Sequence, residues 1–307
     1  MEANKIPPND VQCEGNGVTV SRKMPKVKSL KTDSRYIPNR IYGIDFSGAK
    51  DAGNRIWIAS AVIVGSTIVI EDCYQARHLP GSATERDQCL STLRHFISSQ
   101  KGCACGLDFP FGLPGKLVEA SSWEEFVLSF GSRYPNPKKF RQSCWETAGN
   151  CEEKRYTDRQ SKTPFSPYNL RLYRQTYYGI RDILAPLVGD QAVSVLPVQS
   201  WSPVKPWLLE VCPASTLERM GLRQPYKGHN NDRNKRANRA YILKEIENTG
   251  LVTIKSPALR ATILDSPGGD ALDSVIAAFA TFRAIGSFID SSASATSNSM
   301  LEGHVYI

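Results

Sequence analysis

The stretch IYGIDFSGA, residues 41–49, ends an apolar run on a carboxylate, Asp45, and continues with small residues. Three other stretches have a similar form: CGLD at 105–108, LLE at 208–210 and GDALD at 269–273. A buried carboxylate is costly unless it is paired, hydrogen-bonded or bound to a metal. Four such stretches in a basic protein predict a metal site that the fold assembles.

The composition is that of a globular protein, with 41% hydrophobic and 22% charged residues among 307. The formal net charge of +8 favours polyanionic partners such as nucleic acid but does not fix a function. The charge is unevenly spread, since residues 133–181 carry 11 lysines and arginines against 4 acids. This distribution is typical of an acidic metal centre bordered by a surface that attracts phosphates.

Cysteines, histidines and apolar segments exclude several classes of protein. The eight cysteines lack the paired spacing of a zinc site, so we expect reduced thiols. None of the four histidines lies in a G-x-S-x-G or related hydrolase motif. The first residues lack the apolar segment of a signal peptide, and no apolar run approaches the roughly 20 residues of a membrane span. We therefore expect a cytoplasmic protein that does not enter a membrane.

Two regions are predicted from the polar and apolar pattern. Residues 1–40 are polar, lysine-rich and interrupted by prolines, and they are predicted to be a flexible basic tail. Residues 41–307 are predicted to form a single domain, with a basic, aromatic insertion at about 115–190. Apolar runs predict strands at 41–46, 56–64, 67–73, 103–109, 193–197, 207–211, 252–255 and 304–307.

The order of strands and helices predicts an α/β fold. Short turns at 51–54 and 65–66 join the first three strands as an antiparallel meander. A helix over 83–98, with Ser82 and Glu85 as a capping box, lets the fourth strand return parallel beside the first. Further helices are predicted over 170–188, 232–249 and 271–285.

The acids at the strand ends are the candidate catalytic and metal-binding residues. Asp45 and Asp108 end strands that we expect to be neighbours, and two close carboxylates repel unless a cation lies between them. Asp270 and Asp273 are spaced to share one face of a helix start. Glu210 is either a further ligand or the partner of an arginine. The alternatives are turn aspartates and acids that stabilise a helix dipole.

The insertion interleaves basic and aromatic side chains, which are the groups that bind phosphates and stack on bases. The candidate nucleic-acid-binding residues are Arg155, Arg159, Lys162, Tyr168, Arg171 and Arg174 in the insertion and Arg236 on the later helix. An ordinary amphipathic helix with a solvated basic face would have the same pattern.

Together these features resemble the ribonuclease-H-like superfamily, and the late DALD motif at 270–273 is similar to that of its Holliday-junction resolvase branch. The stretches GIDFSGA (43–49), DFPFG (108–112), EVCPA (210–214) and EGHVYI (302–307) resemble a family of predicted nucleases known as domain of unknown function 429. Cys212 departs from the family pattern, in which an aromatic or small residue is expected there.

The resemblance implies a mixed five-stranded sheet flanked by helices, and Mg²⁺ or Mn²⁺ as cofactor. The function predicted on this basis is a metal-dependent nuclease, in which Asp45, Asp108, Asp270 and Asp273 hold the metal and Glu210 assists. Related resolvases act as dimers, so a homodimer remains open. Two alternatives are an actin-like nucleotide phosphotransferase or ATPase and a non-catalytic nucleic-acid-binding protein on the same scaffold.

Overall fold

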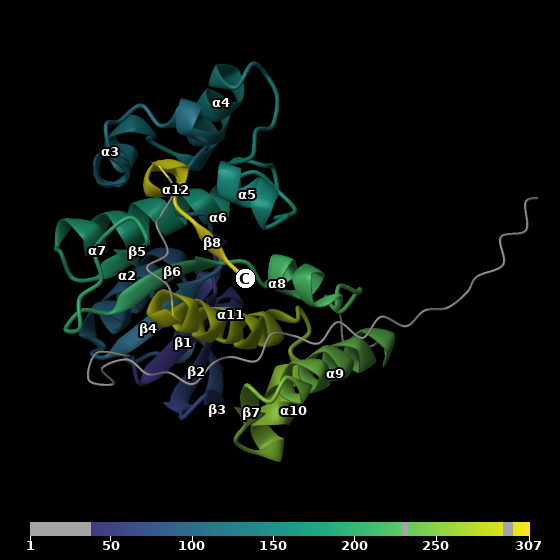
Figure 1. Ribbon diagram of the computed structural model, residues 1–307. Helices are drawn as coiled ribbons and strands as arrows, with labels where there is room; N and C mark the ends of the chain where they lie inside the picture. Colours follow the sequence, from purple (N-terminus) through teal and green to yellow (C-terminus); the bar gives the residue numbers. More distant parts are fainter. Residues whose placement is uncertain (1–37, 229–232, 291–296) are drawn as a thin grey trace, which may run out of the picture.

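The computed structural model describes residues 38–228, 233–290 and 297–307 (Figure 1). Of the predicted tail, residues 1–40, the first 37 lie outside the described residues. Its last residue, Arg40, already belongs to the first strand, which therefore begins one position earlier than predicted.

One mixed sheet of eight strands runs through the described part of the chain. The strands are β1 (Arg40–Asp45), β2 (Trp57–Val64), β3 (Thr67–Gln75), β4 (Cys103–Leu107), β5 (Ser194–Leu196), β6 (Trp207–Val211), β7 (Val252–Ile254) and β8 (Val305–Tyr306). Their order is β5-β6-β4-β1-β2-β3-β7, with β8 paired to β6.

The pairing confirms the predicted meander and crossover. Strands β1, β2 and β3 are antiparallel, whereas β4 returns parallel beside β1, and β6 parallel beside β4. The resemblance implies five strands, whereas the described sheet has eight. The count of five is too low, because β5, β7 and β8 also pair in parallel with their neighbours.

Helices cover both faces of the sheet (Figure 1). They are α1 (Ala52–Arg55), α2 (Arg86–Ser99), α3 (Trp123–Arg133), α4 (Pro137–Thr147), α5 (Tyr156–Gln160), α6 (Tyr173–Tyr178), α7 (Ala185–Gly189), α8 (Pro213–Met220), α9 (Arg233–Asn248), α10 (Pro257–Asp265), α11 (Asp270–Asp290) and α12 (Ser297–Glu302), with short helices η2 (Ala76–His78), η3 (Gly115–Leu117) and η4 (Gly179–Leu184). None within the described residues is both long and apolar enough to cross a membrane.

Two details of the local structure differ from the prediction. Helix α1 stands where a simple turn was expected between β1 and β2. Helix α2 begins after Glu85, whose carboxylate accepts hydrogen bonds from the backbone N–H groups of Asp87 and Gln88, so that Glu85 is the N-cap in place of Ser82.

The alternation of side chains along β1 and β4 decides which residues meet helix α11. Ile41 lies in the core on the side of α11, while Tyr42 and Ile44 lie in the core against the insertion. Gly43 and Gly106 are paired neighbours on β1 and β4. A Cβ at Gly43 would lie 2.1 Å from the carbonyl oxygen of Ser274, and one at Gly106 would lie 1.8 Å from Thr281 Oγ1. The absent side chains let α11 lie directly on the sheet.

Candidate metal centre

Three carboxylates meet where β1 ends and helix α11 begins. Asp45 is the last residue of β1, and Asp270 and Asp273 are in the first turn of α11. Each contributes an oxygen to a group in which all the atoms lie within 4.8 Å of one another. The cluster joins residues more than 200 positions apart in the sequence, and it could hold a metal ion.

Local structure aims these side chains at one another. The strand period of two places Asp45 on the same face as Gly43, which is the face that α11 covers. Gly269 adopts a φ of +81°, a left-handed conformation suited to glycine, and its carbonyl accepts the N–H of Asp273 at 3.0 Å. The helical spacing then puts Asp270 and Asp273 on one face above Asp45.

Asp108 follows β4 and lies at the border of this cluster. Its N–H donates to the carbonyl of Ile44 at 3.0 Å, which fixes it beside the end of β1. It does not belong to the group of oxygens within 4.8 Å. Burial, followed by the charge of Asp273, raises the pKa of Asp108 to about 7. The predicted neighbourhood of Asp45 and Asp108 is therefore correct, although the close group contains Asp45 and not Asp108.

Burial and the neighbouring acids also raise the pKa values of the Asp45 and Asp270 carboxyl groups. Burial and then the charge of Asp273 raise the pKa of Asp45 well above its usual range, and Asp108 and Asp270 add to the effect. The pKa of Asp270 is raised as well, mainly by burial. Such an arrangement disfavours full ionisation unless a cation compensates the charge.

Two residues that the sequence reasoning missed complete the centre. The hydroxyl of Tyr226 donates to Oδ1 of Asp273 at 2.5 Å. The ammonium group of Lys227 forms an ion pair with Oδ2 of the same carboxylate. The charge of Asp273 raises the pKa of Lys227, which is therefore a cation among the acids.

Hydrogen bonds to two other parts of the chain fix the segment that carries Tyr226 and Lys227. The N–H of Gly228 donates to the carbonyl of Pro267 at 3.2 Å, next to the turn before α11. The buried guanidinium of Arg239 donates to the carbonyl of Tyr226 at 2.8 Å and to that of Leu264 at 2.7 Å. The sequence gives only a weak signal for this role, an aromatic and a basic residue after a proline between two predicted elements.

The donor set fits a divalent cation that prefers oxygen ligands. Asp273 is 0% exposed, and among the described residues its Oδ2 is held by the ion pair with Lys227. A buried carboxylate is costly unless its charge is compensated. Three carboxylates against one ammonium group also leave the cluster negative when ionised. Carboxylate oxygens without nitrogen or sulfur ligands are typical of Mg²⁺, Mn²⁺ or Ca²⁺ sites.

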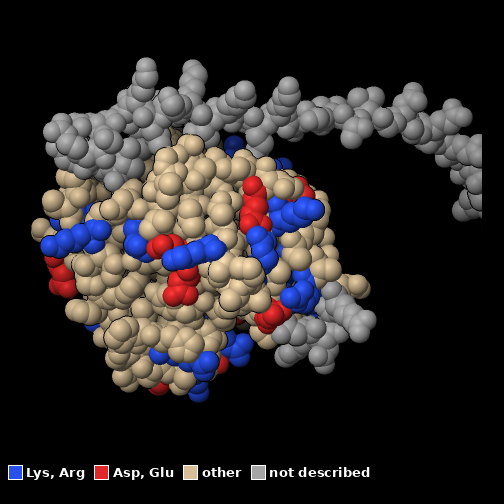
Figure 2. All heavy atoms as spheres, turned by 90° about the horizontal axis from the view of Figure 1, so that it is seen from below, with Lys and Arg blue, Asp and Glu red and all other residues tan. Residues whose placement is uncertain are grey.

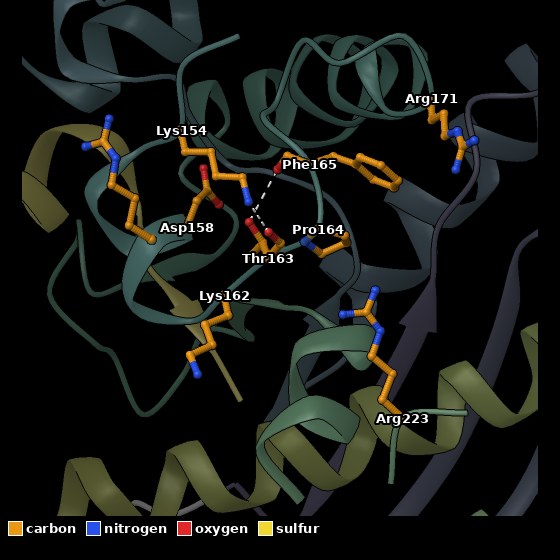
Figure 3. Close-up of a pocket in the computed structure, with 9 residues that line it drawn as sticks. Lys154, Asp158, Lys162, Thr163, Pro164, Phe165, Arg171 and Arg223 are labelled. Atoms are coloured by element: carbon orange, nitrogen blue, oxygen red, sulfur yellow. Dashed lines mark hydrogen bonds between the residues drawn. The ribbon is translucent and has the colours of Figure 1, made fainter. Parts of the chain in front are cut away.

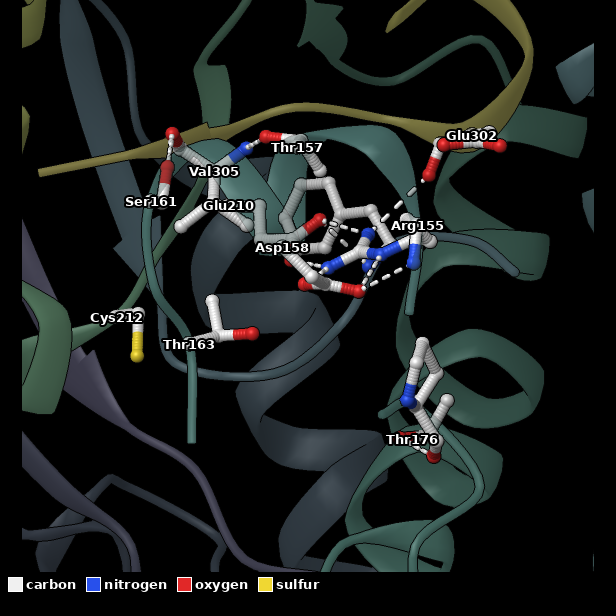
Figure 4. A network of polar contacts seen from close by, with 12 residues as sticks. Arg155, Thr157, Asp158, Ser161, Thr163, Thr176, Glu210, Cys212, Glu302 and Val305 are labelled. Atoms are coloured by element: carbon white, nitrogen blue, oxygen red, sulfur yellow. Dashed lines mark hydrogen bonds and ion pairs between the residues drawn. The ribbon is translucent and has the colours of Figure 1, made fainter. Parts of the chain in front are cut away.

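Glu210 lies on the opposite face of the sheet from the acid cluster. Of its two predicted roles, metal ligand or partner of an arginine, it has the second, because it forms an ion pair with Arg155. Its neighbour Leu209 packs with the core on the α11 side, so Glu210 points toward the insertion. Arg155 donates to Glu210 Oε2 at 2.8 Å and to Asp158 Oδ1 at 2.8 Å, and Figure 4 shows its guanidinium group between the two carboxylates. The N–H of Phe111 also donates to Glu210 Oε2, at 2.9 Å.

The candidate nucleic-acid-binding residues fall into separate places. Arg155 is 1% exposed and Tyr168 is 0% exposed, so neither can contact a nucleic acid, and both are withdrawn from that surface. Arg159, Lys162, Arg171 and Arg174 are exposed on the insertion.

Arg236 belongs to a different surface. It forms an ion pair with Asp265 at 2.7 Å, between α9 and α10. On the face seen from below, Figure 2 shows basic and acidic side chains side by side, with no continuous basic surface.

Comparisons with protein-family models, with curated proteins and with solved structures found no match to this chain. The findings above therefore rest on the sheet and on the carboxylate cluster themselves.

Proposed function

We propose that this protein is a divalent-metal-dependent hydrolase of phosphodiester bonds in nucleic acid, with a ribonuclease-H-like arrangement of its acids. The observation that carries the proposal is the convergence of Asp45, Asp270 and Asp273, with the side chain of Asp273 fully buried. The order of the central strands, with acids at the ends of β1 and β4, supports the same reading.

The three clustered carboxylates would hold Mg²⁺ or Mn²⁺. A bound ion of this kind polarises a phosphoryl oxygen and lowers the pKa of a coordinated water. Asp108, at the border of the cluster, would serve as a proton acceptor beside the ion. Tyr226 holds the carboxylate of Asp273 in place through its hydroxyl.

Lys227 and Glu210 have supporting roles in this proposal. Lys227 is a cation at the edge of the cluster, where it can neutralise Asp273 or meet a substrate phosphate. Glu210 does not touch the cluster but anchors the insertion to β6 through Arg155. It is therefore a positioning residue for the surface that receives the substrate.

The first test is a cleavage assay with Mg²⁺ and with Mn²⁺ on single-stranded, duplex and branched DNA and on RNA. Wild type is compared with Asp45→Asn and Asp270→Asn, and with the matched control Asp190→Asn on the exposed end of α7. We expect metal-dependent cleavage in wild type and the control, and loss of at least 100-fold in the two cluster variants, in line with removal of a catalytic charge.

Metal binding is measured separately by titration calorimetry with Mn²⁺. We expect heat and a thermal shift in wild type, and a much weaker signal in Asp45→Asn. Full cleavage by both cluster variants, or an absence of Mn²⁺ binding in wild type, would contradict the proposal.

A further inference from the structure

A basic cavity of about 710 Å³ opens between the insertion and the segment that follows helix α8. This volume is in the range of ligand-binding sites in proteins. Five basic residues line it: Lys154, Arg159, Lys162, Arg171 and Arg223. The cavity contains none of the clustered acids, so it is a second feature beside the metal centre.

The charge of the cavity is only partly compensated. Its one acid, Asp158, is buried and already engaged by Arg155. Among the residues that the structure describes, no carboxylate forms an ion pair with Lys162 or Arg171, both of which are exposed. An anionic ligand would therefore find cations that it does not have to separate from an internal partner.

Two further cations of the cavity, Arg223 and Arg159, have weak and exchangeable contacts. Arg223 forms an ion pair with Glu218 at 3.1 Å and is 60% exposed, and Arg159 lies 3.9 Å from Glu153 with a similarly exposed side chain. Exposed pairs of this kind contribute little to stability, typically below about 1 kcal/mol. A phosphate can replace such a carboxylate partner without a large cost.

An aromatic wall distinguishes this cavity from a simple phosphate site. Phe165 is half-buried in its lining, and the guanidinium of Arg171 lies 5.6 Å from the centre of its ring. Figure 3 shows the guanidinium groups of Arg171 and Arg223 facing each other across the opening. Cations at an opening and an aromatic face inside are the two elements that recognise a phosphate and an unpaired base.

Short connections link this cavity to the metal centre. Gln175, on α6 and four residues after Arg171, donates to the backbone carbonyl of Asp108. On the other side, Arg223 is four residues from Lys227, which pairs with Asp273. Two short stretches of chain therefore connect the lining of the cavity to residues of the metal centre.

We propose that this cavity binds a nucleotide of single-stranded nucleic acid, with its phosphates between Arg171 and Arg223 and its base against Phe165. The inference rests on the proposed function in naming a nucleic acid, and it adds the class of substrate. A base paired in a duplex cannot reach an aromatic ring inside a cavity, so the site discriminates in favour of unpaired strands.

The test measures binding without cleavage, so that its failure is separate from failure of the nuclease proposal. Fluorescence anisotropy follows labelled single-stranded oligothymidylate and a duplex of equal length in the presence of a chelator. The variants are Arg171→Glu with Arg223→Glu, Phe165→Ala, and a control that reverses two charges outside the cavity, Lys244→Glu with Lys138→Glu.

We expect the double cavity variant to weaken single-strand binding at least tenfold, and the control about twofold or less. For the double cavity variant, the slope of the logarithm of the binding constant against the logarithm of the salt concentration should become shallower by roughly 1.4 units, because two phosphate contacts are lost. Phe165→Ala should weaken binding of the single strand about threefold or more and leave the duplex unchanged. Equal effects of the cavity and control variants, or equal loss of both nucleic acids on Phe165→Ala, would overturn the inference.

Discussion

The ammonium of Lys227 forms an ion pair with Oδ2 of Asp273, the carboxylate of the cluster that is 0% exposed. An internal cation therefore occupies the position toward which a metal ion would be attracted. In a metal-free protein the pair reduces the repulsion among the acids, and in a metal-bound protein it competes with the ion for the same oxygen.

Replacement of this lysine should strengthen metal binding. Lys227→Met keeps the aliphatic length and removes the charge, and we expect Mn²⁺ to bind about fivefold more tightly, or about 1 kcal/mol. Titration calorimetry measures the change, with Lys244→Met on the exposed face of α9 as the control. Weaker Mn²⁺ binding in Lys227→Met would mean that the lysine organises the site and does not compete for it.

Asp108 should make the metal-free protein less stable as the pH rises. Its pKa is raised from 3.8 to about 7 in the folded state, so the folded protein holds this proton more tightly than the unfolded chain does. The contribution to stability is present below about pH 4 and is lost as the pH rises through about 7. The Asp108→Asn variant cannot ionise at this position, so its stability does not fall in this way as the pH rises.

Thermal unfolding in a chelator from pH 5 to pH 8 provides the measurement. The melting temperature of Asp108→Asn, relative to wild type, should increase across this range, while that of Asp190→Asn should not. A difference in melting temperature between Asp108→Asn and wild type that stays constant from pH 5 to pH 8 would show that the pKa of Asp108 is not raised.

The contact between α11 and the sheet should be sensitive to a single methyl group at Gly106. A Cβ there would lie 1.8 Å from Thr281 Oγ1 and 3.1 Å from the carbonyl of Ala277. We expect Gly106→Ala to destabilise the protein by roughly 1–3 kcal/mol and to weaken Mn²⁺ binding, because α11 carries two of the acids. Chemical denaturation and calorimetry measure the two effects.

Gly286, which lies on α11 itself, offers the matched control. A Cβ at Gly286 would meet no atom within 4 Å, so Gly286→Ala should be neutral or stabilise by up to about 1 kcal/mol. Thr281→Ala combined with Gly106→Ala should recover part of the loss, since it removes the nearest atom. A Gly106→Ala variant as stable as wild type would mean that α11 shifts without cost.

The buried pair on the other face should separate stability from metal binding. Arg155→Met leaves Glu210 and Asp158 as two buried carboxylates without their cation, and we expect a loss of about 3–5 kcal/mol in unfolding free energy. Glu210→Gln leaves Arg155 paired with Asp158 and should cost less. Mn²⁺ affinity should be unchanged in Glu210→Gln, and a large loss of affinity would restore Glu210 as a ligand.

The sequence was sufficient for the framework because strands and acids carry local signals. Apolar runs and turn residues predicted all eight strands, and the placement of Asp45, Asp270 and Asp273 followed from strand ends and helix spacing. Glu210 also ends an apolar run, but the face on which it lies depends on the register of β6 with β4, which is not visible along the chain.

The remaining parts of the site depend on tertiary structure. Lys227 lies outside any motif, and its position is set by contacts from Gly228 and from the distant Arg239. The pattern of basic and aromatic residues in the insertion predicts a single surface. Folding divides it, because Arg155 and Tyr168 have partners in the interior while Lys162 and Arg171 remain outside.

The pairing of Arg155 has a consequence for the order in which the molecule folds. Arg155 contacts Glu210 across 55 residues of sequence and the carbonyl of Glu302 across 147. The acid cluster likewise needs Asp270 and Asp273 beside Asp45. Closure of such loops costs conformational entropy. The metal centre and the contacts of Arg155 with Glu302 both need the last part of the chain, so we expect neither to be complete in refolding before that part is in place.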